Sequence, residues 1–397
     1  MAVHQLHFIR QKSYLAVSLT HFFVDILNSG RNLLVAILAI SLGLSNTQVG
    51  IALLLYNVGS SMSQPLFGWL ADRIGPRWLV LGGMGWMMLF YGAAAVAGDW
   101  LALIALTVAG IGSGAFHPTG TMVATQASVA HRTRATALFF MAGQLGLFSG
   151  PILTGLLLRH YGRPAYLVLP ALSFLAFFSG WQWLVDQGQY HHPTAAAATA
   201  KTSGVGARPA NFTRCAILLG AILLAYSTVG IAAMSFAPKL FTEMGFPADY
   251  VGWLSGLFMM GSAIGGVTGG TLADRTNPKS VILIGLLASI LPVYFYIPAP
   301  GAWRFLLLLT AGFFSGMPHS VLVIMVQGLF PKRQAMASGL ALGFMFFSGS
   351  VGSYILGVVA DQIGLALALQ WTAVLPAIAA SATLFLPRAT AVPAAAH

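Results

Sequence analysis

The chain has 397 residues, of which 57% are hydrophobic and only 7% charged, whereas soluble domains carry about 25% charged residues. A soluble core of this size cannot cover so much apolar surface, so the composition excludes a soluble globular protein. The formal net charge is +11, but the 19 basic residues stand singly or in pairs between apolar runs, and this scatter excludes a nucleic-acid-binding face.

Twelve apolar segments follow one another between Gly, Pro and charge clusters, and each has about the 20 residues that cross a bilayer. They cover residues 15–41, 47–70, 77–98, 101–126, 135–159, 164–185, 213–240, 247–271, 279–298, 302–328, 335–360 and 366–386. The sequence therefore predicts an all-α membrane protein with twelve transmembrane helices. Residues 1–12 are polar and basic and precede a run of spanning length, so we expect no cleavable signal.

Basic residues are unevenly divided between alternate loops. Most fall on the side of the N-terminus, and only Arg159, Arg163, Lys239 and Arg304 fall on the other. By the positive-inside rule both termini lie in the cytoplasm, with the chain in the cell (inner) membrane. Residues 187–212 lack apolar periodicity and are predicted to be a cytoplasmic linker between two six-helix bundles, 1–186 and 213–397.

Few ionisable side chains interrupt the apolar segments. Each costs about 2.5–3.5 kcal/mol near the bilayer centre, so each is a candidate functional residue. Asp25 is the one carboxylate in the interior of a predicted helix, about 15 Å from its inner end. We expect Asp25 to carry the coupling proton, although a permanent structural pairing with His21 or Arg31 is an alternative. His117, at similar depth beside Pro118, is the second candidate of the proton relay.

The other polar candidates lie on the first predicted helix and on other predicted helices of both halves. His21, Asp25 and Asn28 lie on one helical face and Asn32 continues it, because their spacing follows i, i+4 and i+7. Arg31 lies about 24 Å along this helix and keeps its charge, so it either recognises an anion, reaches the outer interface or neutralises Asp25. The remaining candidates for contact with substrate are Gln144, Tyr226, His319 and Gln327, and Tyr56, Asn57 and Gln64 are further possible hydrogen-bonding residues of the cavity.

Two blocks of sequence repeat at an offset of 202 residues. Residues 68–77 read Gly-Trp-Leu-Ala-Asp-Arg-Ile-Gly-Pro-Arg, and residues 270–279 read Gly-Thr-Leu-Ala-Asp-Arg-Thr-Asn-Pro-Lys. The same offset places Gly110, Ser113, Gly114 and His117 onto Gly312, Ser315, Gly316 and His319. Two blocks on one offset indicate a duplicated six-helix unit.

These repeated loops resemble the signature of the major facilitator superfamily. The resemblance implies two pseudo-symmetric bundles, a cavity lined by the first, fourth, seventh and tenth helices, and a cytoplasmic latch at the loops. The carboxylates of Asp72 and Asp274 can then sit at the positive N-termini of the eleventh and fifth helices. The latch residues implied are Gly68, Asp72, Arg73, Arg77, Gly270, Asp274, Arg275 and Lys279.

Residues 146–155 of the fifth helix are similar to an antiporter pattern of that superfamily, carried by Gly146, Gly150, Pro151 and Gly155. Small residues also serve ordinary close packing, so this pattern alone leaves direction open. A narrower resemblance to the fosmidomycin-resistance branch is carried by 116–118, by His21 with Asp25, by 143–144, and by 331–340 and 357–361. Thr119 and Arg31 depart from that branch.

No nucleotide-binding loop occurs in the chain, so an ion gradient must supply the energy. We expect a monomeric, proton-coupled exporter that takes a small amphipathic or anionic organic compound, such as an antibiotic, by alternating access and without a cofactor. One alternative is a divalent transition-metal transporter using Asp25 and the histidines. Another is a receptor or scaffold that kept the fold. An enzyme is not expected, because no His-Glu-x-x-His occurs, and the single Cys215 excludes an intrachain disulfide.

Overall fold

The computed structural model describes residues 9–127, 132–184, 211–330 and 334–386, and these are helical without a strand. The chain divides into two compact units, one of Met1–Ala198 with Met234–Gly256 and one of Thr199–Ala233 with Leu257–His397. Most of the predicted linker, up to residue 210, lies outside the described residues.

The helices of the N-terminal half have these bounds: α1 Lys12–Ser41, α2 Asn46–Asn57, α3 Gln64–Ile74, α4 Pro76–Val96, α5 Asp99–Val108, α6 Gly110–Gln126, α7 Arg132–Tyr161, α8 Val168–Leu172 and α9 Phe174–Trp183. Those of the C-terminal half are α11 Phe212–Glu243, α12 Ala248–Arg275, α13 Pro278–Phe295, α14 Trp303–Gly316, α15 Pro318–Leu329, α16 Gln334–Ile363, α17 Leu365–Trp371 and α18 Val374–Leu384.

Eleven helical stretches of the described residues are long and apolar enough to cross a membrane. The predicted segment 47–70 is the twelfth, and there the helix is interrupted. A π-helical turn, Val58–Met62, separates α2 from α3, and Pro65 stands at the start of α3. Proline cannot donate its backbone hydrogen bond and clashes with the preceding turn, which accounts for the interruption.

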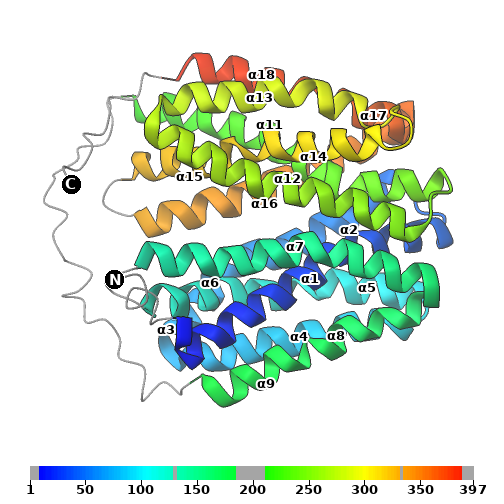
Figure 1. Cartoon of the computed structure of the whole chain (residues 1–397), viewed down its shortest axis with the longest axis vertical. Helices are drawn as coiled ribbons and strands as arrows, with labels where there is room; N and C mark the ends of the chain where they lie inside the picture. Colours follow the sequence, from blue (N-terminus) through cyan, green and yellow to red (C-terminus); the bar gives the residue numbers. More distant parts are fainter. Residues whose placement is uncertain (1–8, 128–131, 185–210, 331–333, 387–397) are drawn as a thin grey trace, which may run out of the picture. The chain divides into compact units, whose positions relative to one another are not determined.

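Helix α1 is the best-buried spanning helix of its unit, because 83% of its most apolar window is buried. It runs beside α6 and α7 (Figure 1). Glycines make the approach to α7 possible: a methyl group added at Gly146 or Gly150 would overlap the backbone carbonyl of Phe22 or Ile26. This close packing brings polar residues of α1 against α7 and α6.

In each half, a basic residue of the repeated loop donates hydrogen bonds to carbonyls at the C-terminus of the last helix. Arg77 donates a hydrogen bond to the carbonyl of Trp181 near the end of α9, with Nη2 and O 3.0 Å apart. Lys279, its counterpart 202 residues later, donates to the carbonyls of Leu384 and Leu386 at 2.7 and 2.9 Å at the end of α18. A cation at a helix C-terminus satisfies free carbonyls and opposes the negative end of the helix dipole.

Candidate functional site

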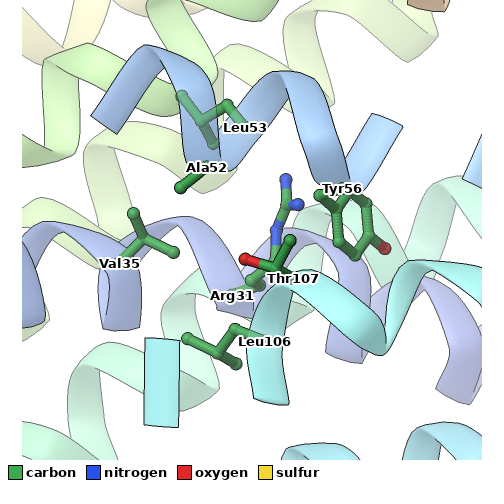
Figure 2. A pocket seen from close by; sticks show the side chains of 7 residues that line it. All are labelled: Arg31, Val35, Ala52, Leu53, Tyr56, Leu106 and Thr107. Atoms are coloured by element: carbon green, nitrogen blue, oxygen red, sulfur yellow. The ribbon is translucent and has the colours of Figure 1, made fainter. Parts of the chain in front are cut away.

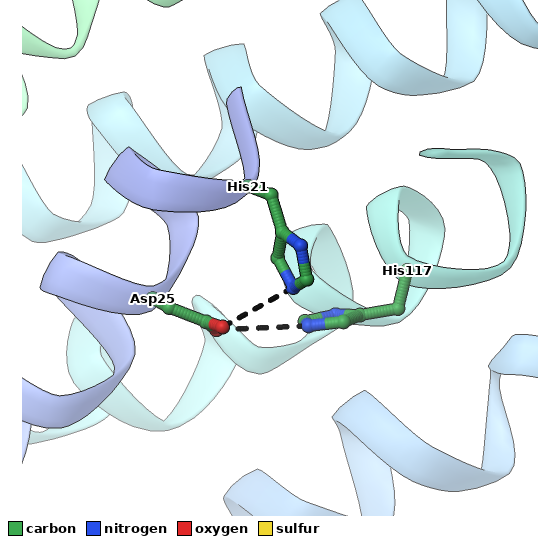
Figure 3. A group of neighbouring side chains, drawn as sticks. All are labelled: His21, Asp25 and His117. Carbon is green, nitrogen blue, oxygen red and sulfur yellow. Dashed lines mark ion pairs between the residues drawn. The ribbon is translucent and has the colours of Figure 1, made fainter. Parts of the chain in front are cut away.

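Asp25, His21 and His117 converge in the interior of the N-terminal half (Figure 3). Asp25 Oδ2 lies 3.2 Å from His21 Nε2, and Asp25 Oδ1 lies 3.6 Å from His117 Nε2. Asp25 is 6% exposed and His21 2% exposed. The i, i+4 spacing on α1 joins the first pair, whereas the second requires α6 to pack against α1.

Backbone carbonyls fix the tautomers of both histidines. His21 Nδ1 lies 2.9 Å from the carbonyl oxygen of Phe139, and His117 Nδ1 lies 2.8 Å from that of Ser113. A carbonyl only accepts hydrogen bonds, so each Nδ1 carries a proton. In the neutral form of each ring, the Nε2 atom that faces Asp25 is therefore an unprotonated acceptor.

The contacts between Asp25 and the two Nε2 atoms lack a hydrogen-bond donor unless one additional proton is bound. If Asp25 were ionised and both histidines neutral, the Nε2 lone pairs would face carboxylate lone pairs in a buried site, which is unfavourable. A proton on the carboxyl group or on either ring converts such a contact into a hydrogen bond or an ion pair. The geometry therefore suits a group that binds and releases a proton.

Neighbouring polar side chains complete a closed network around the carboxylate. Asn28 Nδ2 donates to Asp25 Oδ1 at 3.0 Å and to Ser113 Oγ at 3.1 Å. Ser113 Oγ in turn lies 3.2 Å from His117 Nδ1. Tyr56 donates a short hydrogen bond to Asn28 Oδ1, so α2 joins the same network. Asn28 thus holds Asp25 through Oδ1, the oxygen that also faces His117, whereas Oδ2 faces His21.

Gly143 provides the space for the contact between Asp25 and His21. A Cβ atom at this position of α7 would lie 2.5 Å from His21 Nε2 and 2.7 Å from Asp25 Oδ2. The ring of His21 also stacks on Phe139 of α7 at a centroid distance of 4.2 Å. Helix α7 therefore positions the imidazole from two sides.

Arg31 lies further along α1 and is 6% exposed. Its guanidinium carbon lies 3.4 Å from the centre of the Tyr56 ring, and Nη2 donates to Asn32 Oδ1 at 3.0 Å. Among the described residues it forms no ion pair with a carboxylate, Asp25 included.

The C-terminal half brings together a smaller pair of predicted residues. Tyr226 Oη of α11 lies 3.3 Å from His319 Nδ1 of α15, and Gln327 lies two turns further along α15. The serine equivalent to Ser113 is Ser315, and its buried hydroxyl has no hydrogen-bond partner in the described part of the chain. This half therefore repeats the histidine without the network around it.

Other predicted residues lie apart from the Asp25 network. Gln144 is exposed on α7. Gly155 packs against the backbone of Ala248 in the same compact unit. Of the latch residues, Arg73 stacks on Trp69 with its guanidinium carbon 3.8 Å from the ring centre. Gly68 lies in the middle of α3, Gly270 lies in the second-last turn of α12, and Arg275 is the last residue of α12. The side chains of Asp72 and Asp274 lie outside the described part of the structure.

Two members of the network, Ser113 and Gly143, were not among the predicted candidates, whereas Tyr56 was predicted as a possible hydrogen-bonding residue of the cavity. Ser113 precedes His117 by four residues and belongs to the repeated block, and this spacing was the available signal. Gly143 carries no polar group, so only the approach of α7 to α1 reveals its role.

The same three ionisable side chains offer ligand atoms for a metal ion. One atom each from His21, Asp25 and His117 lies within 4.8 Å of the others. Two imidazole nitrogens and a carboxylate oxygen are suitable ligands for Zn²⁺ and other divalent transition metals, with a fourth position left for water or substrate. Both hydrogen-bonded Nδ1 atoms leave Nε2 available, as metal-binding histidines require.

Comparison with known proteins adds the family context. Residues 17–218 and 217–396 each match the model of the Major Facilitator Superfamily. The chain is 29% identical over 384 residues to the fosmidomycin resistance protein of Escherichia coli (strain K12), which covers 94% of this chain and 92% of that protein. It is 28% identical over 377 residues to an uncharacterized MFS-type transporter, YfnC, of Bacillus subtilis (strain 168). That match covers 91% of this chain and 90% of YfnC.

One relative that matches part of the chain, and two solved structures, are also similar to this protein. The multidrug resistance protein MdtG of Salmonella paratyphi A (strain ATCC 9150 / SARB42) is 24% identical over 249 residues, or 58% of each chain. A bacterial homolog of the human lysosomal transporter Spinster has a TM-score of 0.73 at 16% identity, covering 94% of this chain and 95% of that one. The nucleoside transporter NupG has a TM-score of 0.70 at 15% identity, covering 94% and 98%. The two structures support the fold alone.

Proposed function

Because this chain belongs to the major facilitator superfamily, and is thus a multi-pass membrane transporter and not an enzyme, we propose that it exports a small organic compound in exchange for protons. The exporter would work as a monomer by alternating access, with both termini in the cytoplasm. Its cargo would be an amphipathic or anionic molecule such as an antibiotic. Resistance proteins among its relatives support this class of cargo.

The observation that carries the proposal is the arrangement of two acceptor nitrogens around one buried carboxyl group. His21 and His117 both use Nδ1 on a backbone carbonyl, so their Nε2 atoms compete with Asp25 for a proton. Proton gain and loss at this site would change the charge inside the N-terminal half, which biases a conformational equilibrium. We assign proton coupling to Asp25 and His117, with His21 and Asn28 as positioning residues.

Helix α7 and the relatives support export as the direction of transport. Gly146 and Gly150 let α7 contact the backbone of α1 beside the proposed proton site, so the helix that carries the antiporter-like pattern also borders Asp25. Motion of α7 relative to α1 would therefore disturb the proton site directly. Export is consistent with two of the relatives, a fosmidomycin resistance protein and a multidrug resistance protein.

A test uses the full-length protein in proteoliposomes that contain a pH-sensitive dye. Fosmidomycin, amphipathic drugs and divalent metals are added in turn, to wild type and to Asp25→Asn. The proposal expects a pH change with an organic compound that is absent in Asp25→Asn. Counterflow of a compound that gives no proton signal would contradict proton coupling, and a complete absence of transport would favour a receptor or scaffold.

One observation favours a second candidate, transport of a divalent transition metal. The three ligand atoms of His21, Asp25 and His117 are close enough to share one ion. A pH or uptake signal confined to metals in the same experiment, and lost in both His21→Asn and His117→Asn, would support the metal and exclude drug export.

A further inference from the structure

Arg31 is a buried cation whose hydrogen-bonding capacity is only partly used. Its Nη2 donates to Asn32, while the buried Nε has no hydrogen-bond partner among the described residues. The side chain is 6% exposed, and no carboxylate of the described part of the chain pairs with it. A guanidinium keeps its charge at any physiological pH, and an unpaired buried charge is costly. An anion that binds to the guanidinium would compensate this charge.

The guanidinium projects from α1 toward α2 and borders a narrow hollow (Figure 2). The hollow has an empty volume of about 160 Å³, part of which is open to solvent. In this conformation the hollow is too tight to hold a water molecule, so an anionic head group reaches the guanidinium only when the side chains around it move apart. The rest of its lining is Val35, Ala52, Leu53, Tyr56, Leu106 and Thr107.

The hollow combines the charge of Arg31 with an apolar lining. Four of the seven residues are aliphatic, and Thr107 and Tyr56 flank the guanidinium. The guanidinium carbon lies 3.4 Å from the centre of the Tyr56 ring, and this contact orients the planar group. Nη2 donates to Asn32, whereas Nε has no hydrogen-bond partner among the described residues. A planar fork of donors is suited to two oxygens of one anionic group.

We propose that Arg31 binds the head group of an organic anion, a carboxylate or a phosphonate, whose apolar part contacts the aliphatic residues of the hollow. This inference rests on the proposed transport function and specifies the class of its substrate. It also makes Arg31 the residue that determines a preference for anions over neutral compounds of the same shape.

The anion site and the proton site share one polar network. Tyr56 stacks on Arg31 and donates to Asn28, and Asn28 donates to Asp25. A bound anion that moves the guanidinium would shift Tyr56, and through Asn28 the carboxylate that holds the proton. Both sites lie in the N-terminal half, so this coupling requires no contact with the other unit.

The test measures binding without a gradient, so it is independent of transport. Purified full-length protein in detergent is titrated with benzylphosphonate, phenylacetate and neutral phenylacetamide, and thermal stabilisation is recorded. We expect wild type to bind at least one of the two anions and not the amide. Arg31→Gln should weaken that binding about 10- to 100-fold, the loss typical of a charge-assisted hydrogen-bond pair. Comparison of the two anions separates phosphonate from carboxylate preference.

Two further variants are controls for the effect of Arg31→Gln on anion binding. Arg31→Lys keeps the charge without the planar fork and should bind with intermediate affinity, which also covers the case in which Arg31→Gln fails to fold. Arg159→Gln removes a positive charge from the exposed end of α7 and should bind as wild type does.

Three outcomes would overturn the assignment. They are equal stabilisation of wild type and Arg31→Gln by the anions, equal binding of the amide, and no stabilisation by either anion. Asp25→Asn should still bind the anion. A proton signal with neutral compounds only would remove the anion site and leave the proposed exporter intact, whereas anion binding without any proton signal would do the reverse.

Discussion

At the scale of single residues, the contact between Asp25 and His21 depends on the absence of a side chain at position 143. The Cβ of an alanine there would lie 2.5 Å from His21 Nε2 and 2.7 Å from Asp25 Oδ2, so the imidazole and the carboxylate would have to separate. Displacements of about 1 Å at a reacting group can cost on the order of 100-fold in rate.

Gly143→Ala is therefore expected to slow proton-coupled transport by about 10- to 100-fold. The measurement is the initial rate of substrate-driven pH change in proteoliposomes. Gly82→Ala on α4 is the matched control, because no atom lies within 4 Å of the added methyl group. If both variants transport at the wild-type rate, the contact between Asp25 and His21 has no role in coupling.

The residues of this site differ in how far the sequence reveals them. His21, Asp25 and Asn28 follow helical spacing within one segment, so their common face is predictable from local geometry. His117 faces Asp25 only because α6 packs beside α1, and the repeat indicated its depth but not its orientation. The roles of Tyr56 and Gly143 come from helix packing, which no periodicity in a single sequence specifies.

At the scale of helices, the last basic residue of each repeated loop donates hydrogen bonds to the C-terminus of the final helix of its own half. Arg77 contacts the end of α9 and Lys279 the end of α18. The sequence predicted both residues to belong to a latch, from the family resemblance. Their observed partners indicate a capping role within each half, which a sequence motif cannot distinguish from a latch.

Lys279→Ala is expected to lower stability by about 1–2 kcal/mol, because two carbonyls at the end of α18 lose a charged donor. Thermal unfolding in detergent measures the loss, and Arg159→Ala is a control for removal of a surface cation. An unchanged unfolding midpoint for Lys279→Ala would contradict the capping role.

The twelve predicted segments illustrate what hydrophobicity does and does not specify. Eleven correspond to helical stretches of the described residues that are long and apolar enough to span, because length and apolar content determine spanning. In the remaining segment a π-helical turn at Val58–Met62 separates α2 from α3, and this turn was not predicted. Such turns depend on local backbone energetics around Pro65 rather than on hydrophobic periodicity.

At the scale of the whole molecule, the two halves share a repeat but not their charges. The position 202 residues after Asp25 is Ser227, whose hydroxyl donates to the carbonyl of Leu223. His319 pairs with Tyr226 and has no carboxylate beside it among the described residues. The duplicated unit therefore carries one candidate proton site, in the N-terminal half.

Conformational cycling belongs to this scale, and the proposed latch predicts how it changes. Asp72→Asn removes the charge that would hold a helix N-terminus, so it should slow transport several-fold while leaving substrate affinity unchanged. Counterflow rates at saturating and limiting substrate separate these effects. Asp249→Asn at the start of α12 is the control carboxylate, and an equal rate in both variants would remove Asp72 from the latch.

The most direct test of the account is to measure Asp25→Asn in two modes, proton-driven accumulation and counterflow at equal pH on both sides. If Asp25 carries the proton, accumulation is lost while counterflow continues near the wild-type rate, since exchange of substrate requires no proton transfer. Accumulation that persists in Asp25→Asn, with folding and incorporation equal to wild type, would contradict the central claim that this carboxylate couples the proton gradient to transport.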